Sequence, residues 1–202
     1  MLAVLTRHAQ STLNLAGRVN GDPTVEAPLT DEGRAQAERL ALQLRGLPLD
    51  LAVHTRFGRT RDTAEAAVAG RRVRLEVEPL LDDIDVGDLD GASIADYRAW
   101  KHAHRRSDRF PGGESLDEAA RRYARAFRLL AARPEPHLLV VCHEIPVRYA
   151  LNGAAGSDDL DAPVHDVPNA TPYLFDAAAL LRAAARIEEL TPPADADGRA
   201  RA

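Results

Sequence analysis

The sequence predicts an α/β domain, a three-layer sandwich in which a central, mostly parallel sheet is flanked by helices. Short apolar runs alternate with stretches of helical periodicity along the chain, and this alternation is typical of strand-helix-strand units. The apolar runs are too uniform for a sheet with one solvated face, so we expect helices on both faces. The length of 202 residues suits one domain. We assign that domain to residues 1–190 and a disordered tail to residues 191–202, where a small polar run has nothing to pack against.

Capping residues and apolar spacing predict the elements of the first half. Thr30, an N-cap type followed by Asp31 and Glu32, starts a helix with apolar side chains at helical spacing. The expected elements are strands at Leu2–Thr6, Leu49–Val53 and Val73–Val77, helices from Thr30 to Leu44 and from Thr60 to Ala69, and an acidic loop from Asp82 to Gly91. The strand at Val73–Val77 alternates apolar and charged residues, which indicates an edge or half-covered position.

The second half repeats the same unit. Ser115 and Glu118 form a capping box that opens a long helix. The run from His137 to Cys142 is the most continuous apolar strand of the chain, and Pro146 stands where the first turn of another helix would start. The expected elements are a helix after Ser93, a basic loop from Arg105 to Gly113, a helix from Ser115 to about Ala132, the strand His137–Cys142, a helix at Pro146, a strand at Tyr173–Phe175 and a helix from Asp176 to Glu189.

Composition narrows the function classes. No apolar run approaches the roughly 20 residues that a membrane span needs, and the N-terminus lacks a secretory pattern, so we expect a cytoplasmic protein with no membrane partner. The single cysteine, Cys142, can form neither an intramolecular disulfide nor a thiolate metal cage. A net charge of −5 without a basic tail argues against nucleic-acid binding. Lys101 is the only lysine, and the many arginines suit phosphate or carboxylate ligands.

Polar residues follow three predicted strands at the point where each strand ends. Arg7 and His8 follow the first strand, Arg59 comes shortly after the second, and His143 follows the strand that ends at Cys142. The carboxyl ends of parallel strands meet at one edge of a sheet, where ligands of such folds bind. Four cations there would repel one another and lower the pKa of each histidine, unless an anion occupies the middle. A phosphoryl group fits, because arginines can hold its oxygens without a metal.

The same residues resemble the signature of the histidine phosphatase superfamily, which includes the cofactor-dependent phosphoglycerate mutases. Arg7-His8-Ala9 resembles the Arg-His-Gly motif of that family, and further blocks match in the same order. These blocks are Leu29-Thr30 with Gly33, Gln36 and Ala37; Thr55 to Ala64; the acidic block Leu81 to Gly91; the loop Pro111 to Ser115; and Val140 to His143. Together they cover the chain from about Leu2 to Asn169.

The resemblance implies roles for individual residues. His8 would be the catalytic nucleophile that forms a phosphohistidine. His143 would be the second catalytic histidine and would help to hold the phosphoryl oxygens. Arg7, Arg59 and Asn14 would bind the phosphoryl group of a small phosphorylated substrate, with no metal and no cofactor. Asp83 falls where the family places its general acid, usually a glutamate. Asp82 and Asp85 compete for that role, and a solvated acidic loop is the alternative interpretation.

Three departures from the family pattern bear on function. Ala9 replaces the usual glycine, Gln10 the usual glutamate, and Glu144 the glycine after the second histidine. Glu144 would place a carboxylate beside the phosphate, where it would either repel the substrate or orient His143.

The leading hypothesis for the reaction is a metal-independent phosphomonoesterase that works through a phosphohistidine. Mutases of the family that this sequence resembles generally carry longer insertions that enclose the site. Here only Asp90 to Gly113 lies between the acidic block and the Gly-Gly-Glu-Ser loop, so the resemblance favours hydrolysis over mutase chemistry. Arg105 and Arg106 in that segment would bind a substrate carboxylate or form a solvated helix end. The alternatives are a phosphoglycerate mutase-type phosphoryl transferase and a catalytically weak phosphate-binding module. The oligomeric state does not follow from the sequence.

Overall fold

The computed structural model describes residues 1–192 and contains a five-stranded sheet with the order β3-β2-β4-β1-β5. The strands are β1 Leu2–Arg7, β2 Leu51–His54, β3 Arg74–Val77, β4 His137–Cys142 and β5 Tyr173–Asp176. The pairs β1–β4, β4–β2 and β2–β3 are parallel, whereas β5 pairs with β1 in antiparallel orientation. This arrangement confirms the predicted mostly parallel sheet.

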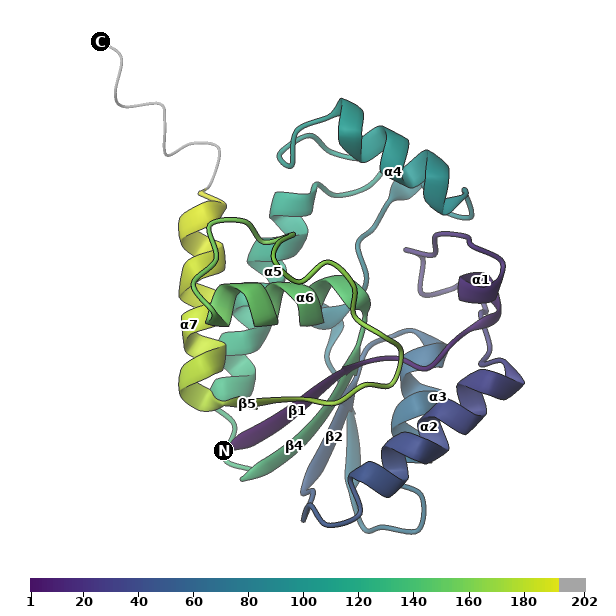
Figure 1. The fold of residues 1–202 in the computed structure, drawn as a ribbon, viewed down its shortest axis with the longest axis vertical. Coiled ribbons are helices and arrows are strands. Elements are labelled where there is room, and N and C mark those ends of the chain that lie inside the picture. The colour runs from purple at the N-terminus through teal and green to yellow at the C-terminus, as the bar shows by residue number, and fades with distance from the viewer. Residues whose placement is uncertain (193–202) are drawn as a thin grey trace.

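Helices cover both faces of the sheet and form the two outer layers (Figure 1). Helices α2 Asp31–Gln43 and α3 Gly58–Ala67 cover one face, and α5 Leu116–Ala131, α6 Glu144–Ala154 and α7 Ala177–Leu190 cover the other. Alternate side chains of β1 enter the two cores, Ala3 and Leu5 on the α5 side and Val4 on the α2 side. The three inner strands β1, β2 and β4 are buried on both faces, which accounts for their uniform apolar runs. Strand β3 lies at an edge of the sheet and alternates charged and apolar residues.

Two helices lie beyond the carboxyl ends of the strands (Figure 1). The short helix α1 Thr12–Leu15 follows β1, and Ser11 caps it in a capping box with Asn14. Helix α4 Ile94–Ala103 follows Ser93, as predicted, and Ser93 is its N-cap. One 3-10 turn, Pro79–Leu81, precedes the acidic loop, and a second, Gly87–Leu89, lies within it. Helix α1 and these turns were absent from the sequence prediction because each is too short to show a periodic apolar pattern.

Several predicted boundaries differ from those of the structure. Strand β2 begins at Leu51 and not at Leu49, whose side chain is nonetheless buried. Helix α3 begins at Gly58, which places Arg59 within its first turn. Thr191, the first residue of the predicted tail, is buried, and its hydroxyl donates to the carbonyl oxygen of Ile187 at 2.8 Å. The rest of that prediction, from residue 193 on, lies outside the described residues.

The loop after β1 is held by the neighbouring helices. The amide of Ala9 donates to Thr63 Oγ1 of α3 at 3.0 Å, and the amide of Gln10 donates to Gln36 Oε1 of α2 at 2.8 Å. Gly33 lies so close to this loop that a Cβ atom there would stand 2.1 Å from the Gln10 carbonyl oxygen. A larger residue would therefore push α2 away from the loop that carries His8. No helix within residues 1–192 is long and apolar enough to cross a membrane.

Candidate active site

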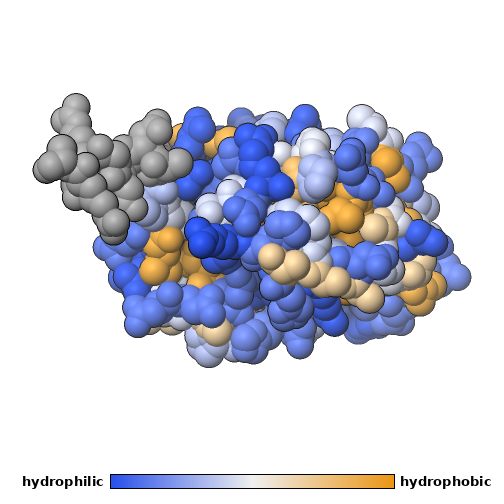
Figure 2. Space-filling model, turned by 90° about the horizontal axis from the view of Figure 1, so that it is seen from above, coloured by the Kyte–Doolittle hydropathy of each residue, from blue (hydrophilic) through white to orange (hydrophobic). Residues whose placement is uncertain are grey.

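A cavity of about 520 Å³ lies at the carboxyl ends of the parallel strands, beneath α4 and beside α1. Seen from the α4 end, the surface is mostly hydrophilic, with small groups of hydrophobic residues between the polar ones (Figure 2). Five of the predicted site residues line the cavity: Arg7, His8, Asn14, Arg59 and Asp83. His143 does not line it but lies in contact with His8, with 5.5 Å between the two ring centres. The remaining wall includes Leu13, Val19, Ile84, Val86, Ile94, Tyr97 and Ile145 together with Arg18, Arg98, Lys101 and Arg148.

His8 directs the lone pair of its Nε2 atom toward the guanidinium of Arg59. Its ring is 2% exposed, and Nδ1 lies 2.7 Å from the carbonyl oxygen of Ala9. A carbonyl oxygen only accepts hydrogen bonds, so the proton of the neutral ring sits on Nδ1 and leaves Nε2 with its lone pair. The amide of Asn169 fixes the backbone here by donating to the His8 carbonyl oxygen at 2.7 Å. Nε2 is thus in the protonation state of a nucleophile.

Arg59 bridges the two histidines and the acidic loop. Its Nε donates to His8 Nε2 at 3.0 Å, and its NH2 lies 3.2 Å from both His143 Nδ1 and Asp83 Oδ2. Asn20 holds the guanidinium from the other side: its side-chain oxygen accepts from NH1 and its carbonyl oxygen accepts from NH2 at 3.1 Å. The guanidinium also stacks over the Phe57 ring, 4.3 Å from its centre. Burial, outweighing the nearby Asp83, lowers the pKa of Arg59.

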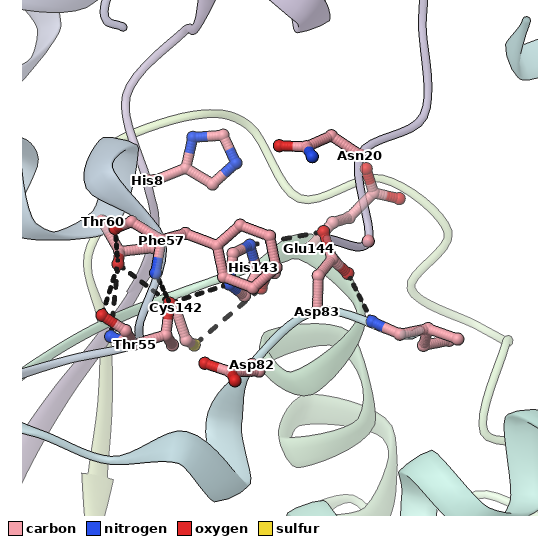
Figure 3. A network of polar contacts seen from close by, with 12 residues as sticks. His8, Asn20, Thr55, Phe57, Thr60, Asp82, Asp83, Cys142, His143 and Glu144 are labelled. Carbon is pink, nitrogen blue, oxygen red and sulfur yellow. Dashed lines mark hydrogen bonds and ion pairs between the residues drawn. The ribbon is translucent and has the colours of Figure 1, made fainter. Parts of the chain in front are cut away.

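His143 is held between Thr55 and Asp83 (Figure 3). The Thr55 hydroxyl lies 3.0 Å from His143 Nε2, and Asp83 Oδ2 lies 3.3 Å from Nδ1. The edge of the Phe57 ring closes one side, with 4.7 Å between ring centres. Burial lowers the pKa of both His8 and His143 well below 6.5, and the charge of Arg59 lowers it further. Repulsion among the cations was expected to be the cause, but desolvation is the larger effect.

The structure separates the three aspartates that competed for the role of general acid. Of the three, only Asp83 faces the two histidines. Asp82 is 4% exposed and accepts from the backbone amide of Arg56 at 2.9 Å and from its Nε at 2.5 Å. Asp85 is exposed, and its side chain accepts from the Gly87 amide at 3.0 Å. Asp82 and Asp85 therefore shape the loop, whereas Asp83 is placed to exchange protons with a ligand.

The Gly-Gly-Glu-Ser loop positions the segment that carries Asp83. Arg122 of α5 donates from NH1 to the carbonyl oxygens of Leu80 and Asp82, each at 2.9 Å. Glu114 pairs with Arg122 at 2.5 Å and accepts from the Asp85 amide at 3.1 Å. Burial raises the pKa of Asp83, although the neighbouring Arg59 lowers it. The acidic block and this loop, distant in sequence, are thus joined by hydrogen bonds and an ion pair around the segment that carries Asp83.

Arg7 makes a contact that the sequence did not predict. Its NH1 donates to the Val167 carbonyl oxygen at 3.0 Å and lies 2.8 Å from Glu144 Oε2. The other carboxylate oxygen of Glu144 lies 3.2 Å from Arg148 NH1. Of the two alternatives for Glu144, the structure does not support the one in which it orients His143, because among the described residues Glu144 makes no hydrogen bond or ion pair with His143. Its charge lies beside Arg7. The cavity that Arg7 and Arg59 line is therefore also lined by two carboxylates, those of Asp83 and Glu144.

Asn14, Arg105 and Arg106 occupy different positions relative to the cavity. Asn14 lines it, and its side-chain oxygen accepts from the Ser11 amide at 3.2 Å, which leaves its amide group available. Neither Arg105 nor Arg106 lines the cavity. Arg106 is bound to Asp117, Asp161 and the Tyr149 hydroxyl. Of the basic residues between Asp90 and Gly113, Arg98 and Lys101 of α4 line the cavity, so the structure does not support the alternative in which Arg105 and Arg106 bind a substrate carboxylate there.

Comparison with known proteins identifies the family. The model of the histidine phosphatase superfamily (branch 1) matches residues 3–179. This chain belongs to the histidine phosphatase superfamily. A Proteus mirabilis protein named "Probable phosphoglycerate mutase GpmB" is 31% identical over 160 residues, 75% of this chain and 74% of that protein. Rat 6-phosphofructo-2-kinase/fructose-2,6-bisphosphatase 4 is 32% identical over 85% of this chain, which corresponds to 37% of that protein.

Solved structures show the same fold. The Thermus thermophilus protein TTHB049 is 32% identical, with a TM-score of 0.66, over 87% of this chain and 94% of that one. The alpha-ribazole phosphatase from Shigella flexneri has a TM-score of 0.76 at 22% identity, over 87% of this chain and 90% of that one, and it supports the fold alone. Members of the histidine phosphatase superfamily are phosphatases or mutases, so phosphatase or phosphoryl-transfer chemistry is supported for this chain.

Three contributors to this histidine phosphatase site were missed by sequence reasoning. Asn20 supports Arg59, Thr55 supports His143, and Asn169 anchors the backbone of His8. Thr55 and Asn169 lay in or at the end of the matched blocks, but a lone polar side chain there carries no sign of its partner. Among residues 1–192, no group of three or more His, Cys, Asp or Glu side chains is arranged to hold a metal ion.

Proposed function

We propose that this chain is a metal-independent phosphomonoesterase that acts on a small phosphorylated metabolite through a phosphohistidine on His8. The observation that carries the proposal is the lone pair of His8 Nε2, which is set by the Ala9 carbonyl oxygen and surrounded by Arg59 and Arg7. A neutral imidazole amid cations combines a nucleophile with the charges that hold a phosphoryl group. The cavity of about 520 Å³ is within the range of small-molecule sites.

In the first step, His8 Nε2 attacks phosphorus while the ester oxygen leaves. The phosphoryl oxygens take the place of two sets of contacts in the free site: the Arg59 bond to Nε2, and the contacts of the Asp83 carboxyl group with Arg59 and His143. In its protonated form, Asp83 gives its proton to the leaving oxygen, so that the O–P bond breaks, an alcohol departs, an N–P bond forms and Asp83 is left ionised. Burial raises the pKa of Asp83, which increases the fraction that carries this proton.

In the second step, water attacks the phosphohistidine on the side that the alcohol has vacated. Asp83, now ionised, accepts a proton from that water, the N–P bond breaks, and inorganic phosphate leaves. Arg7, Arg59 and His143 neutralise the charge that spreads over the phosphoryl oxygens in both steps. His8 returns to the tautomer with its proton on Nδ1.

A mutase-type transfer is the second candidate, favoured by the likeness to the Proteus mirabilis protein. A mutase returns the phosphoryl group to a hydroxyl of the bound sugar or acid and must exclude water meanwhile. Here Asp83 is 27% exposed, and this exposure supports entry of water at the acid. Hydrolysis therefore remains the leading proposal.

The test is turnover of p-nitrophenyl phosphate and a panel of metabolite phosphates, including 3-phosphoglycerate, with EDTA present. The wild-type protein should release phosphate from these esters. When the substrate carries ³²P and the reaction is quenched without acid, the protein should carry a ³²P label that is stable to base and labile to acid. His8→Ala should lose both label and turnover, whereas Asp166→Asn, on the rim of the same cavity, should keep them. Equal activity in wild type and His8→Ala refutes the proposal. Formation of 2-phosphoglycerate without release of phosphate favours the mutase.

A further inference from the structure

Glu144 belongs to a chain of ion pairs that runs from the site into the protein. Its carboxylate lies 2.8 Å from Arg7 NH1 and 3.2 Å from Arg148 NH1, and Arg148 NH2 lies 3.1 Å from Asp161 Oδ1. Arg148 is 8% exposed and also donates from NH1 to the His165 carbonyl oxygen at 2.7 Å. Glu144 itself is 31% exposed and lines the cavity. Arg7 and Arg148 line the same cavity, so this network meets the space for a ligand at all three residues.

The network is incompletely bonded in the structure. Among the described residues, four buried side-chain polar atoms lack a hydrogen-bond partner, and two of them are N–H donors of this network: Arg7 Nε and Arg148 Nε. Buried polar groups are normally satisfied, and exceptions call for an explanation such as a functional rearrangement. Two arginines here share one carboxylate, and each keeps an unused N–H. An additional anion would supply the missing acceptors.

We propose that Glu144 is an internal counter-ion of Arg7, displaced by the phosphoryl group of the ligand and then held by Arg148. This inference rests on the proposed function, because it requires phosphate to bind at Arg7. Glu144 and Arg148 are four residues apart on α6, the spacing at which helical side chains meet. When phosphate takes the Arg7 N–H groups, the Glu144 carboxylate moves wholly to Arg148. Glu144 is a specificity-determining residue, and Arg148 positions it.

The consequence is a site that holds inorganic phosphate less tightly than its cations alone would allow. Each phosphate that binds must break the Arg7–Glu144 pair and tolerate the nearby carboxylate. Substrates whose leaving groups contact the rest of the cavity overcome this penalty, but free phosphate has no such contacts. Glu144 therefore favours release of the product.

Phosphate titration calorimetry on four proteins tests this coupling: wild type, Glu144→Gln, Arg148→Met and the double variant. Coupling energies between contacting residues commonly correspond to about 2–100-fold in an equilibrium constant. Glu144→Gln should bind inorganic phosphate about tenfold more tightly. Arg148→Met should bind it more weakly, because Glu144 then stays on Arg7. In the double variant, Arg148→Met should have little further effect, since no carboxylate remains to be held.

Asp166→Asn is the matched control, because Asp166 lines the same cavity, carries the same charge and makes no ion pair within residues 1–192. An equal gain in phosphate affinity in Asp166→Asn and Glu144→Gln overturns the inference in favour of general electrostatics. Unchanged affinity in Glu144→Gln overturns it as well. If Arg148→Met does not fold, the comparison of Glu144→Gln with Asp166→Asn decides alone. A wild-type protein that neither binds phosphate nor hydrolyses esters contradicts the proposed function itself.

Discussion

Replacing Asp83 with asparagine removes the proton of the proposed acid while keeping the shape of the side chain. Asp83 is the acidic residue of the acidic loop that reaches the histidines, with Oδ2 3.2 Å from Arg59 NH2 and 3.3 Å from His143 Nδ1. General acid catalysis is typically worth about 10²–10⁴-fold in rate. That benefit depends on the leaving oxygen, because a strongly basic alkoxide needs a proton and a weakly basic phenolate does not.

We therefore expect Asp83→Asn to lower kcat/KM by about 10²–10⁴-fold for an alkyl phosphate such as glycerol phosphate. The loss for p-nitrophenyl phosphate should be less than about tenfold, because its weakly basic leaving group departs without needing a proton.

The substitution also affects the binding of phosphate. Two opposite charges 3.2 Å apart attract by about 5 kcal/mol at an effective dielectric constant of 20. Partial exposure and solvent screening make the net value smaller, but the incoming phosphate need no longer displace a carboxylate from Arg59.

The assay is steady-state kinetics on both esters, because kcat/KM reports the steps up to formation of the phosphohistidine. Asp85→Asn is the control: it removes the same charge from the same loop, outside the cavity that holds His8. A loss of equal size for the alkyl and the aryl ester refutes the assignment of Asp83 as the acid. A loss in Asp85→Asn that matches Asp83→Asn refutes it too.

Three further predictions concern the histidines. Burial and Arg59 lower the pKa of His8 and His143 well below 6.5, so neither ring should titrate in NMR spectra between pH 7 and 6; a midpoint near 6.5 for either ring is the opposing result. In the unfolded chain the two histidines take up protons near pH 6.5, whereas in the folded chain they do not. The free energy of unfolding should therefore fall as the pH drops below 6.5, and urea titration at a series of pH values measures this. Thr55→Val should remove the hydroxyl 3.0 Å from His143 Nε2 and cost about 1–3 kcal/mol of transition-state or folding free energy. Kinetics and melting curves separate the two, and unchanged values in both contradict the supporting role of Thr55.

The layered α/β architecture, and the edge of the sheet at which the candidate site residues lie, could be predicted from the sequence alone. Strand periodicity and helix caps are local signals, and parallel strands bring their carboxyl ends together whatever their order. That is why Arg7, His8, Arg59 and His143 could be placed near one another before any contact was known. The order of the matched blocks also pointed to the family, because it depends on residue types and spacing alone.

Tertiary structure decided which of several similar side chains faces the site. Asp82, Asp83 and Asp85 are equivalent in sequence, and they differ because Arg122 and Glu114 hold their loop in one orientation. The partner of Glu144 is Arg7 and not its neighbour His143, because the carboxylate lies on the same side of α6 as Arg148 and beside the end of β1. Such pairings join residues from distant segments, and no local pattern encodes them.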